Sequence, residues 1–197
     1  MRILGISGSL RRDSHNTALL RAAAEMLPPG AELEIFDGLR DVPPYDSDFD
    51  TPELQGPGVD ALKEAIERAD AILIATPEYN HSIPGVLKNA LDWASRPVRA
   101  NVLRGKPVAV VGASTGLFGA VWSQAETRKV LAAIGADVVD RELPVMQAHM
   151  QFDEYGNLRE EDLRDQLGEH VAALVAATRR TSTMSELESD VTDVRVG

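Results

Sequence analysis

The 197-residue chain contains no cysteine. Disulfides, thiol nucleophiles and thiolate metal ligands all require cysteine, so none of the three is available to this protein. Its four histidines are scattered without the spacing of metal ligands, at His15, His81, His149 and His170. The spacing indicates no Ser–His–Asp set either. The sequence therefore predicts neither a metal site nor a nucleophilic catalyst.

Long apolar runs and an excess of positive charge are also missing. No run approaches the roughly 20 residues that cross a bilayer. The N-terminal MRILGISGSL reads directly as a strand, without a basic and then apolar leader. We therefore expect a cytoplasmic protein with no membrane contact. The formal net charge is −11. Because nucleic-acid binding needs a clustered cationic surface, no nucleic-acid partner is expected.

Short apolar strands alternate with helical patterns along the chain. The strand candidates are Arg2–Ser7, Glu32–Phe36, Ala71–Thr76, Pro107–Ala113 and Asp137–Glu142. The third and fourth are nearly continuous apolar runs, which are typical of central strands in a parallel sheet covered on both faces. The alternation predicts a doubly wound α/β fold.

Helical stripes fill the segments between these strands. Four stripes are evident: Leu19, Ala22, Ala23, Met26 and Leu27; Val59, Leu62, Ile66 and Ala69; Ile83, Leu87, Ala90, Leu91 and Ala94; and Leu163, Leu167, Val171, Leu174 and Val175. We assign residues 1–180 to a single domain. Residues 181–197 are polar and acidic without useful periodicity, which predicts a flexible tail or a segment lying against a partner subunit.

A polar loop, SGSLRRDSHNT over residues 7–17, follows the first predicted strand and leads directly into a helix. The free N–H groups of a helix N-terminus bind anions. Further donors suited to a phosphate are the hydroxyls of Ser9, Ser14 and Thr17, the Asn16 amide and the Arg11 guanidinium. The loop matches neither GxxxxGK[ST] nor GxGxxG. The alternative interpretation is an ordinary helix cap formed by Ser14 or Asn16, with solvated arginines.

A second loop, TPEYNHSIPG over residues 76–85, follows the third predicted strand. Pro77 and Pro84 bracket the turn, so its backbone should be stiff and its N–H and C=O groups pre-aimed. Such an edge suits a flat heterocycle with alternating donors and acceptors, and Tyr79 offers an apolar face for the ring.

Together, GSLRRDSHN and TPEYNHSIPGVLKNALDW resemble the signature of the NADPH-dependent FMN reductase family, which includes quinone, azo-dye and chromate reductases. The resemblance covers roughly residues 1–177, with both loops and their spacing intact. It implies a flavodoxin-like fold, a doubly wound five-stranded parallel sheet in the order 2-1-3-4-5. It also implies bound FMN, with NADPH or NADH as co-substrate and small-molecule electron acceptors.

The resemblance assigns contacts to three loops. The implied FMN contacts are Ser9, Leu10, Arg11, Ser14, His15, Asn16 and Thr17 in the first loop; Pro77, Glu78, Tyr79 and Asn80 in the second; and Ser114, Thr115 and Gly116 in a third. An ordinary glycine-rich strand-to-helix turn is the alternative for that third loop. His81 and Phe118 are the candidates for substrate contact.

The scarcity of catalytic side chains fits a flavoenzyme, in which the cofactor carries the redox chemistry and the protein binds and orients it. The expected cycle passes hydride from nicotinamide to flavin N5. It then passes reducing equivalents to quinones, free flavin, azo compounds or metal oxyanions by ping-pong kinetics. The alternatives are a flavodoxin-type electron carrier and an FMN-based redox sensor. A receiver domain is disfavoured, because the first and third strands end in Ile6-Ser7 and Thr76-Pro77 rather than in acidic residues.

The helix predicted over Ile83–Ser95 has a possible second face. Val86 and Trp93 lie seven residues apart on it. An exposed tryptophan in such a stripe suggests a subunit contact, and the family's usual assemblies favour a homodimer or homotetramer. The alternative is a core helix buried on two sides.

Overall fold

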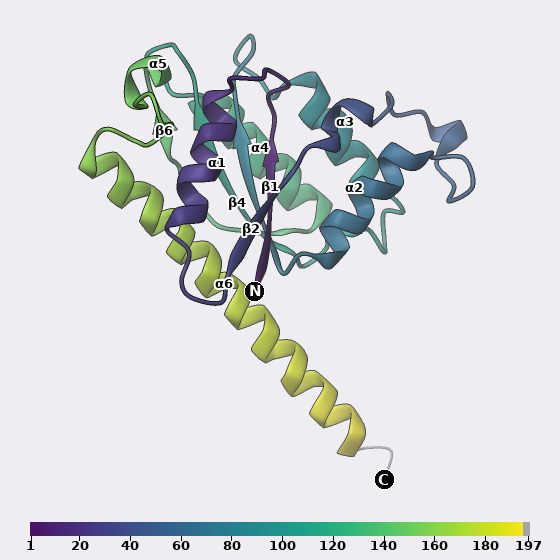
Figure 1. Ribbon diagram of the computed structural model, residues 1–197. Coiled ribbons are helices and arrows are strands. Elements are labelled where there is room, and N and C mark those ends of the chain that lie inside the picture. The colour runs from purple at the N-terminus through teal and green to yellow at the C-terminus, as the bar shows by residue number, and fades with distance from the viewer. Residues whose placement is uncertain (195–197) are drawn as a thin grey trace.

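A parallel sheet in the order β2-β1-β3-β4-β5 forms the middle layer of the protein (Figure 1). The computed structural model describes residues 1–194. The strands are β1 (Arg2–Ser7), β2 (Glu32–Phe36), β3 (Ala71–Thr76), β4 (Pro107–Ala113), β5 (Asp137–Val138) and β6 (Pro144–Val145). The predicted flavodoxin-like order is confirmed, and the first four strands have their predicted bounds.

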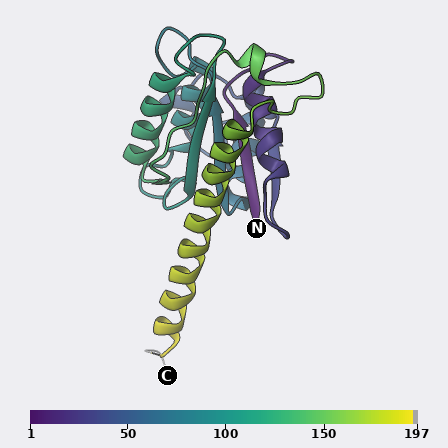
Figure 2. The same ribbon diagram turned by 90° about the vertical axis from the view of Figure 1, so that its left-hand side faces the viewer.

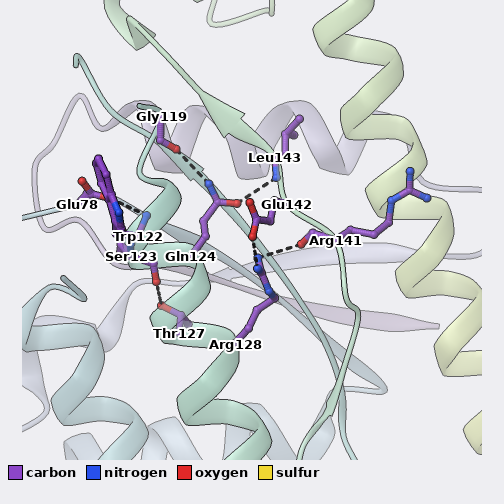
Figure 3. Close-up of polar contacts among 10 residues, drawn as sticks. All are labelled: Glu78, Gly119, Trp122, Ser123, Gln124, Thr127, Arg128, Arg141, Glu142 and Leu143. Atoms are coloured by element: carbon purple, nitrogen blue, oxygen red, sulfur yellow. Dashed lines mark hydrogen bonds and ion pairs between the residues drawn. The ribbon is translucent and has the colours of Figure 1, made fainter. Parts of the chain in front are cut away.

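The prediction of one continuous last strand, Asp137–Glu142, is wrong. β5 pairs with Pro107 and Val108 of β4 and ends at Val138, while β6 pairs with Gly112 and Ala113 after a gap. In the gap, side chains of helix α4 (Val121–Ile134) form hydrogen bonds with backbone groups that would otherwise pair with a neighbouring strand. Gln124 Oε1 accepts the Leu143 N–H at 3.0 Å, and the Arg128 guanidinium donates to the Arg141 carbonyl at 3.2 Å (Figure 3).

Helices cover both faces of the sheet (Figures 1 and 2). α1 (His15–Glu25) and α6 (Glu161–Val194) pack on one face, while α2 (Pro57–Arg68), α3 (Gly85–Ala94) and α4 pack on the other. Short elements lie in the connections: η1 (Gly38–Asp41), η2 (Ser47–Phe49) and α5 (Ala148–Gln151). None of the helices in the described part of the chain is long and apolar enough to span a membrane.

The central strands are buried on both faces, which explains their continuous apolar sequences. Ile72 and Ile74 of β3 enter the core under α2, α3 and α4, whereas Leu73 and Ala75 enter the core under α1 and α6. Successive side chains of a strand point to opposite faces, so a strand with helices on both sides needs apolar residues at every position.

Trp93 belongs to the core, so the expectation of an exposed tryptophan in a subunit contact is wrong. Its side chain is 1% exposed, and its indole N–H donates to the Pro43 carbonyl at 2.8 Å. The Tyr45 ring packs edge-on against it, with ring centroids 4.9 Å apart. The segment before α2 thus folds back over α3 and buries its second face, as the alternative interpretation predicted.

The C-terminal helix continues well past the predicted domain boundary at residue 180. α6 runs without a break to Val194, and both views show its end projecting beyond the sheet (Figures 1 and 2). Its buried side chains run from Leu167 to Thr178, and residues 179–183 are exposed. Packing against the sheet therefore stops near the predicted boundary although the helix does not. A separate tail over residues 181–197 stays a prediction, and residues 195–197 lie outside the described residues.

Candidate functional site

The loops after β1, β3 and β4 meet at the carboxyl edge of the sheet and enclose a cleft of about 180 Å³. Because the three strands are parallel neighbours, all three loops leave the sheet at this edge. The predicted residues that line the cleft are Ser9, Arg11, Ser14, His15, Asn16, Pro77, Glu78, Tyr79, Ser114 and Thr115. Ala113, which the sequence did not single out, lines it too. Tertiary structure thus brings all three predicted loops together.

The first loop presents donors at the start of α1. Ser14 is the N-cap, and its hydroxyl accepts the Thr17 N–H at 3.3 Å, as the alternative interpretation predicted. The N–H groups of His15 and Asn16 occupy the first turn and have no acceptor among the described residues. Arg11 is exposed and forms no ion pair within residues 1–194. Helix capping and anion binding are therefore compatible here.

Asn16 has a structural role that the sequence did not reveal. Its side chain is 3% exposed, and its amide exchanges two hydrogen bonds with the backbone of Ala113, both 2.9 Å long. These bonds tie the start of α1 to the end of β4. The amide keeps one N–H for a ligand. Asn16 is thus first a positioning residue, which holds the first and third loops at a constant separation.

The second loop is a tight hairpin. Tyr79 and Ser82 exchange backbone hydrogen bonds of 3.3 and 3.1 Å. Asn80 and His81 between them both lie in the left-handed region, with φ of 54° and 59°. Two positive φ values define the type I′ turn, which matches the twist of a two-residue hairpin. The stiffness expected from the prolines thus comes in large part from this turn.

Helix α4 holds the second loop in place. The Glu78 carboxylate accepts the N–H groups of Trp122 and Ser123, at 3.0 and 3.2 Å, at the N-terminus of α4 (Figure 3). Glu126, one turn later, accepts the Ser82 hydroxyl at 2.6 Å and the Ile83 N–H at 3.4 Å. A carboxylate is favoured at a helix N-terminus because the helix dipole is positive there. The second loop is therefore anchored to α4 at both of its ends.

The third loop rests on close packing at its base. A Cβ on Gly112 would lie 2.9 Å from the Thr76 carbonyl oxygen and 2.9 Å from Gln124 Nε2, so only glycine fits. The Gln124 amide donates to the Gly119 carbonyl at 3.0 Å and accepts from Leu143 (Figure 3). Gln124 is fully buried, and its two hydrogen bonds join Gly119, just before α4, to Leu143, just before β6. No sequence pattern marked it.

Four of the predicted cofactor residues lie outside the cleft lining: Leu10, Thr17, Asn80 and Gly116. Leu10 and Thr17 line a separate cavity, and Asn80 forms the hairpin turn. The Gly116 carbonyl accepts the Gln147 N–H at 2.9 Å. These residues shape the loops, and cofactor contact by them stays a prediction.

The two predicted substrate residues gather at Trp122 beside the second loop. The rings of His81 and Phe118 lie 4.6 and 4.9 Å from the Trp122 ring, centroid to centroid. His81 Nδ1 is 3.5 Å from the Glu78 carboxylate. Trp122 was not anticipated, because its place depends on how the third loop turns into α4. Substrate contact by His81 and Phe118 stays a prediction.

His15 sits in a cationic corner of the cleft. Its ring stacks on Phe152, with centroids 5.8 Å apart. Burial lowers the pKa of His15 below its usual value, and the neighbouring Arg11 and His149 lower it further. The imidazole is therefore neutral at pH 7. A phosphate in the cleft would meet the Arg11 guanidinium there.

One family model and several named proteins are similar to this chain. The family model described as NADPH-dependent FMN reductase matches residues 1–150. An NAD(P)H-dependent FMN reductase of Pseudomonas aeruginosa is 40% identical over 181 residues, which cover 91% of this chain and 96% of that protein. A 2-hydroxy-1,4-benzoquinone reductase of a Burkholderia species is 40% identical over 170 residues, covering 85% and 90%.

The solved structure of a flavoenzyme is also similar to this chain. The flavoenzyme NAD(P)H:(acceptor) oxidoreductase FerB from Paracoccus denitrificans superposes with a TM-score of 0.80 at 34% identity, over 91% of this chain and 98% of that one. The superposition therefore covers most of this chain.

Proposed function

Since the chain belongs to the NADPH-dependent FMN reductase family, an oxidoreductase family, we propose that it binds FMN in the cleft and transfers reducing equivalents from NAD(P)H to quinone-type acceptors. The observation that carries this proposal is the meeting of the three predicted loops around one cleft. The similar proteins named as quinone reductases support a small-molecule acceptor.

The donor set of the cleft fits FMN at both ends. Arg11, the Ser9 hydroxyl and the free N–H groups of His15 and Asn16 suit a phosphate dianion at a helix N-terminus. Pro77, Glu78 and Tyr79 of the second loop and Ser114 and Thr115 of the third line the space where a flat ring system would lie. The Tyr79 ring is 54% exposed and available for contact with a ligand.

FMN, when bound, supplies the hydride-accepting and hydride-donating chemistry. The residues of the chain would bind the flavin and orient it. Arg11 and the start of α1 would hold the phosphate. The two hydrogen bonds between Asn16 and Ala113 fix the separation of the first and third loops. The N-terminus of α4 binds the Glu78 carboxylate and Glu126 of α4 binds Ser82, so the second loop is rigid before a ligand arrives. Such preorganisation reduces the entropic cost of orienting the reactants.

We also propose a homodimer or homotetramer. Several large apolar side chains near the rim of the cleft are exposed: Tyr79, Leu117, Phe118, Trp122, Met146 and Met150. Exposed apolar side chains that gather in one region typically mark an interaction surface. A second subunit would bury them. The cytoplasmic location expected from the sequence stays a prediction.

The test is to purify the protein, record its visible spectrum and mix it rapidly with NADH or NADPH under anaerobic conditions. We expect a flavin absorbance band that bleaches on mixing and returns when benzoquinone is added, with parallel double-reciprocal lines in steady state. A colourless protein that takes up no FMN in calorimetry would refute the proposal. A bound flavin that NAD(P)H does not bleach would favour the electron carrier or the redox sensor instead.

A further inference from the structure

A second cavity, of about 320 Å³, lies beside the first loop on the side of β2. Ser9 and Arg11 line both this cavity and the cleft, so the loop separates the two spaces. The other residues that line the cavity are Ser7, Leu10, Thr17, Arg21, Ile35, Phe36, Asp37, Leu39 and Arg40. They come from the end of β1, the first loop, α1 and the segment from β2 to η1, of which only the first loop and the start of α1 also line the cleft.

Three arginines converge on this cavity in a chain with a net charge of −11. Arg11, Arg21 and Arg40 form no ion pair within the described part of the chain. Arg40 is oriented by the Leu10 carbonyl, to which its guanidinium donates at 3.1 Å. Asp37 is the one carboxylate in the lining, so positive charge is in excess. A local excess of guanidinium groups attracts a dianion and binds it with charge-assisted hydrogen bonds.

The cavity also has an apolar wall. Leu10, Ile35, Phe36 and Leu39 supply it, and Leu39 is only 4% exposed. The Phe36 ring lies across Gly38, where a Cβ would come within 2.8 Å of the ring edge. An aromatic and aliphatic wall beside clustered cations is the chemistry that receives a nucleotide, with the base on the wall and the phosphate at the arginines.

On the basis of the proposed function, we infer that this cavity binds the 2′-phosphoadenosine end of NADPH and that Arg21 and Arg40 select NADPH over NADH. The cavity adjoins the carboxyl end of β2, where an arginine of a doubly wound sheet can accommodate the 2′-phosphate. β2 lies two strands from β3 in the sheet, about 10 Å away, so one extended dinucleotide can reach from the second loop to the cavity.

Adenosine 2′,5′-bisphosphate is the direct probe, with adenosine 5′-monophosphate as the ligand that lacks the 2′-phosphate. Calorimetric titration of the FMN-loaded protein should show tighter binding of the bisphosphate. Arg21→Ala and Arg40→Ala should each weaken it by about 10- to 150-fold, the effect of one lost charge-assisted hydrogen bond. Binding of the monophosphate should not change. Arg12→Ala is the matched control, because Arg12 is exposed and lines neither space.

Steady-state kinetics completes the test. In both variants KM for NADPH should rise by the factor by which binding of the bisphosphate weakens. KM for NADH and the flavin spectrum should stay as in the wild type. Equal affinity of the wild type for the two adenosine nucleotides would overturn the inference, as would equal weakening of NADPH and NADH. Loss of FMN from the variants would assign the cavity to the flavin instead. Failure of the wild type to oxidise either nucleotide would refute the proposed function, whereas the titration would still test the cavity.

Discussion

Arg11 combines exposure with a position between two ligand spaces. Its side chain lines both the cleft and the second cavity, and no carboxylate in the described residues neutralises it. A cation that the protein itself does not pair is available to an anionic ligand. This is the physical ground for assigning it to the FMN phosphate.

Arg11→Ala should weaken FMN binding by about 10- to 150-fold, since it removes one charge-assisted hydrogen bond. The measurement is fluorescence titration of the flavin-free protein with FMN. Arg12→Ala removes the same charge from the neighbouring exposed position and should bind FMN like the wild type. If the two variants retain FMN equally, the phosphate does not contact Arg11.

Asn16→Ala should lower both stability and FMN affinity. The substitution removes two buried hydrogen bonds and leaves the N–H and C=O of Ala113 without partners. An unsatisfied buried polar group costs about 1–3 kcal/mol, so we expect the free energy of unfolding to fall by at least that amount. Urea denaturation of the flavin-free protein measures this loss separately from cofactor binding. An unchanged midpoint would show that Asn16 does not tie α1 to β4.

Among the elements, α4 organises more of the site than its own sequence suggests. Its N-terminus holds Glu78, and Gln124 joins Gly119 to Leu143 (Figure 3). Glu126 holds the end of the second loop. The same helix interrupts the last strand by binding backbone groups of Arg141 and Leu143. One helix therefore sets both the rigidity of the second loop and the irregular edge of the sheet.

α6 carries the buried titratable group His170 against the sheet. Its side chain is 3% exposed, Nδ1 lies 3.1 Å from the Gln166 carbonyl, and Nε2 has no hydrogen-bond partner within residues 1–194. Burial lowers the pKa of His170, and the positive charge of Arg141 adds to the effect, which outweighs the raising influence of the Gln166 carbonyl and Glu169. The unfolded chain therefore takes up a proton on this histidine at a higher pH than the folded protein does.

Stability should consequently fall as the pH drops from about 7.5 through about 6.5, the ordinary pKa of histidine, and on to the lower pKa of the folded state. His170→Leu should flatten this dependence, leaving the smaller contribution of His15, whose pKa is lowered as well. Urea denaturation between about pH 5 and 8 measures the slope. His81→Asn is the control, because that imidazole is exposed and asparagine tolerates the left-handed backbone of position 81. A wild-type slope retained in His170→Leu would show that α6 tolerates the charged imidazole.

At the scale of the whole molecule, charge and apolar surface are unevenly distributed. The chain is strongly acidic overall, yet arginines converge on the second cavity, and exposed aromatic and methionine side chains gather near the rim of the cleft. The first feature suits an anionic ligand and the second suits a second subunit.

Light scattering at micromolar concentration should give the mass of a dimer or tetramer. Leu117→Glu should shift the protein toward the monomer, because Leu117 is 66% exposed in the proposed contact and a buried carboxylate there would be unpaired. Leu54→Glu is the matched control, since Leu54 is 55% exposed in the segment before α2. A monomeric wild type would contradict the proposed assembly.

The sequence by itself determined the doubly wound class, the helix faces and the first two loops of the site, and its resemblance to the family implied the sheet order and the third loop. Helical and strand periodicity follow from backbone geometry, and a doubly wound parallel sheet brings the loops after neighbouring strands to one edge. That is why residues as far apart as Ser9, Tyr79 and Thr115 could be predicted to line one cleft.

Tertiary structure alone decided which side chains are free to bind. Asn16 and Arg11 look equally suited to a phosphate in the sequence, but the Asn16 amide binds Ala113 whereas Arg11 has no partner in an ion pair among the described residues. Trp93 is buried and Trp122 is exposed for the same reason, because segments distant in the chain cover the first and leave the second open. Hydrogen bonding and burial depend on neighbours that only the folded chain provides.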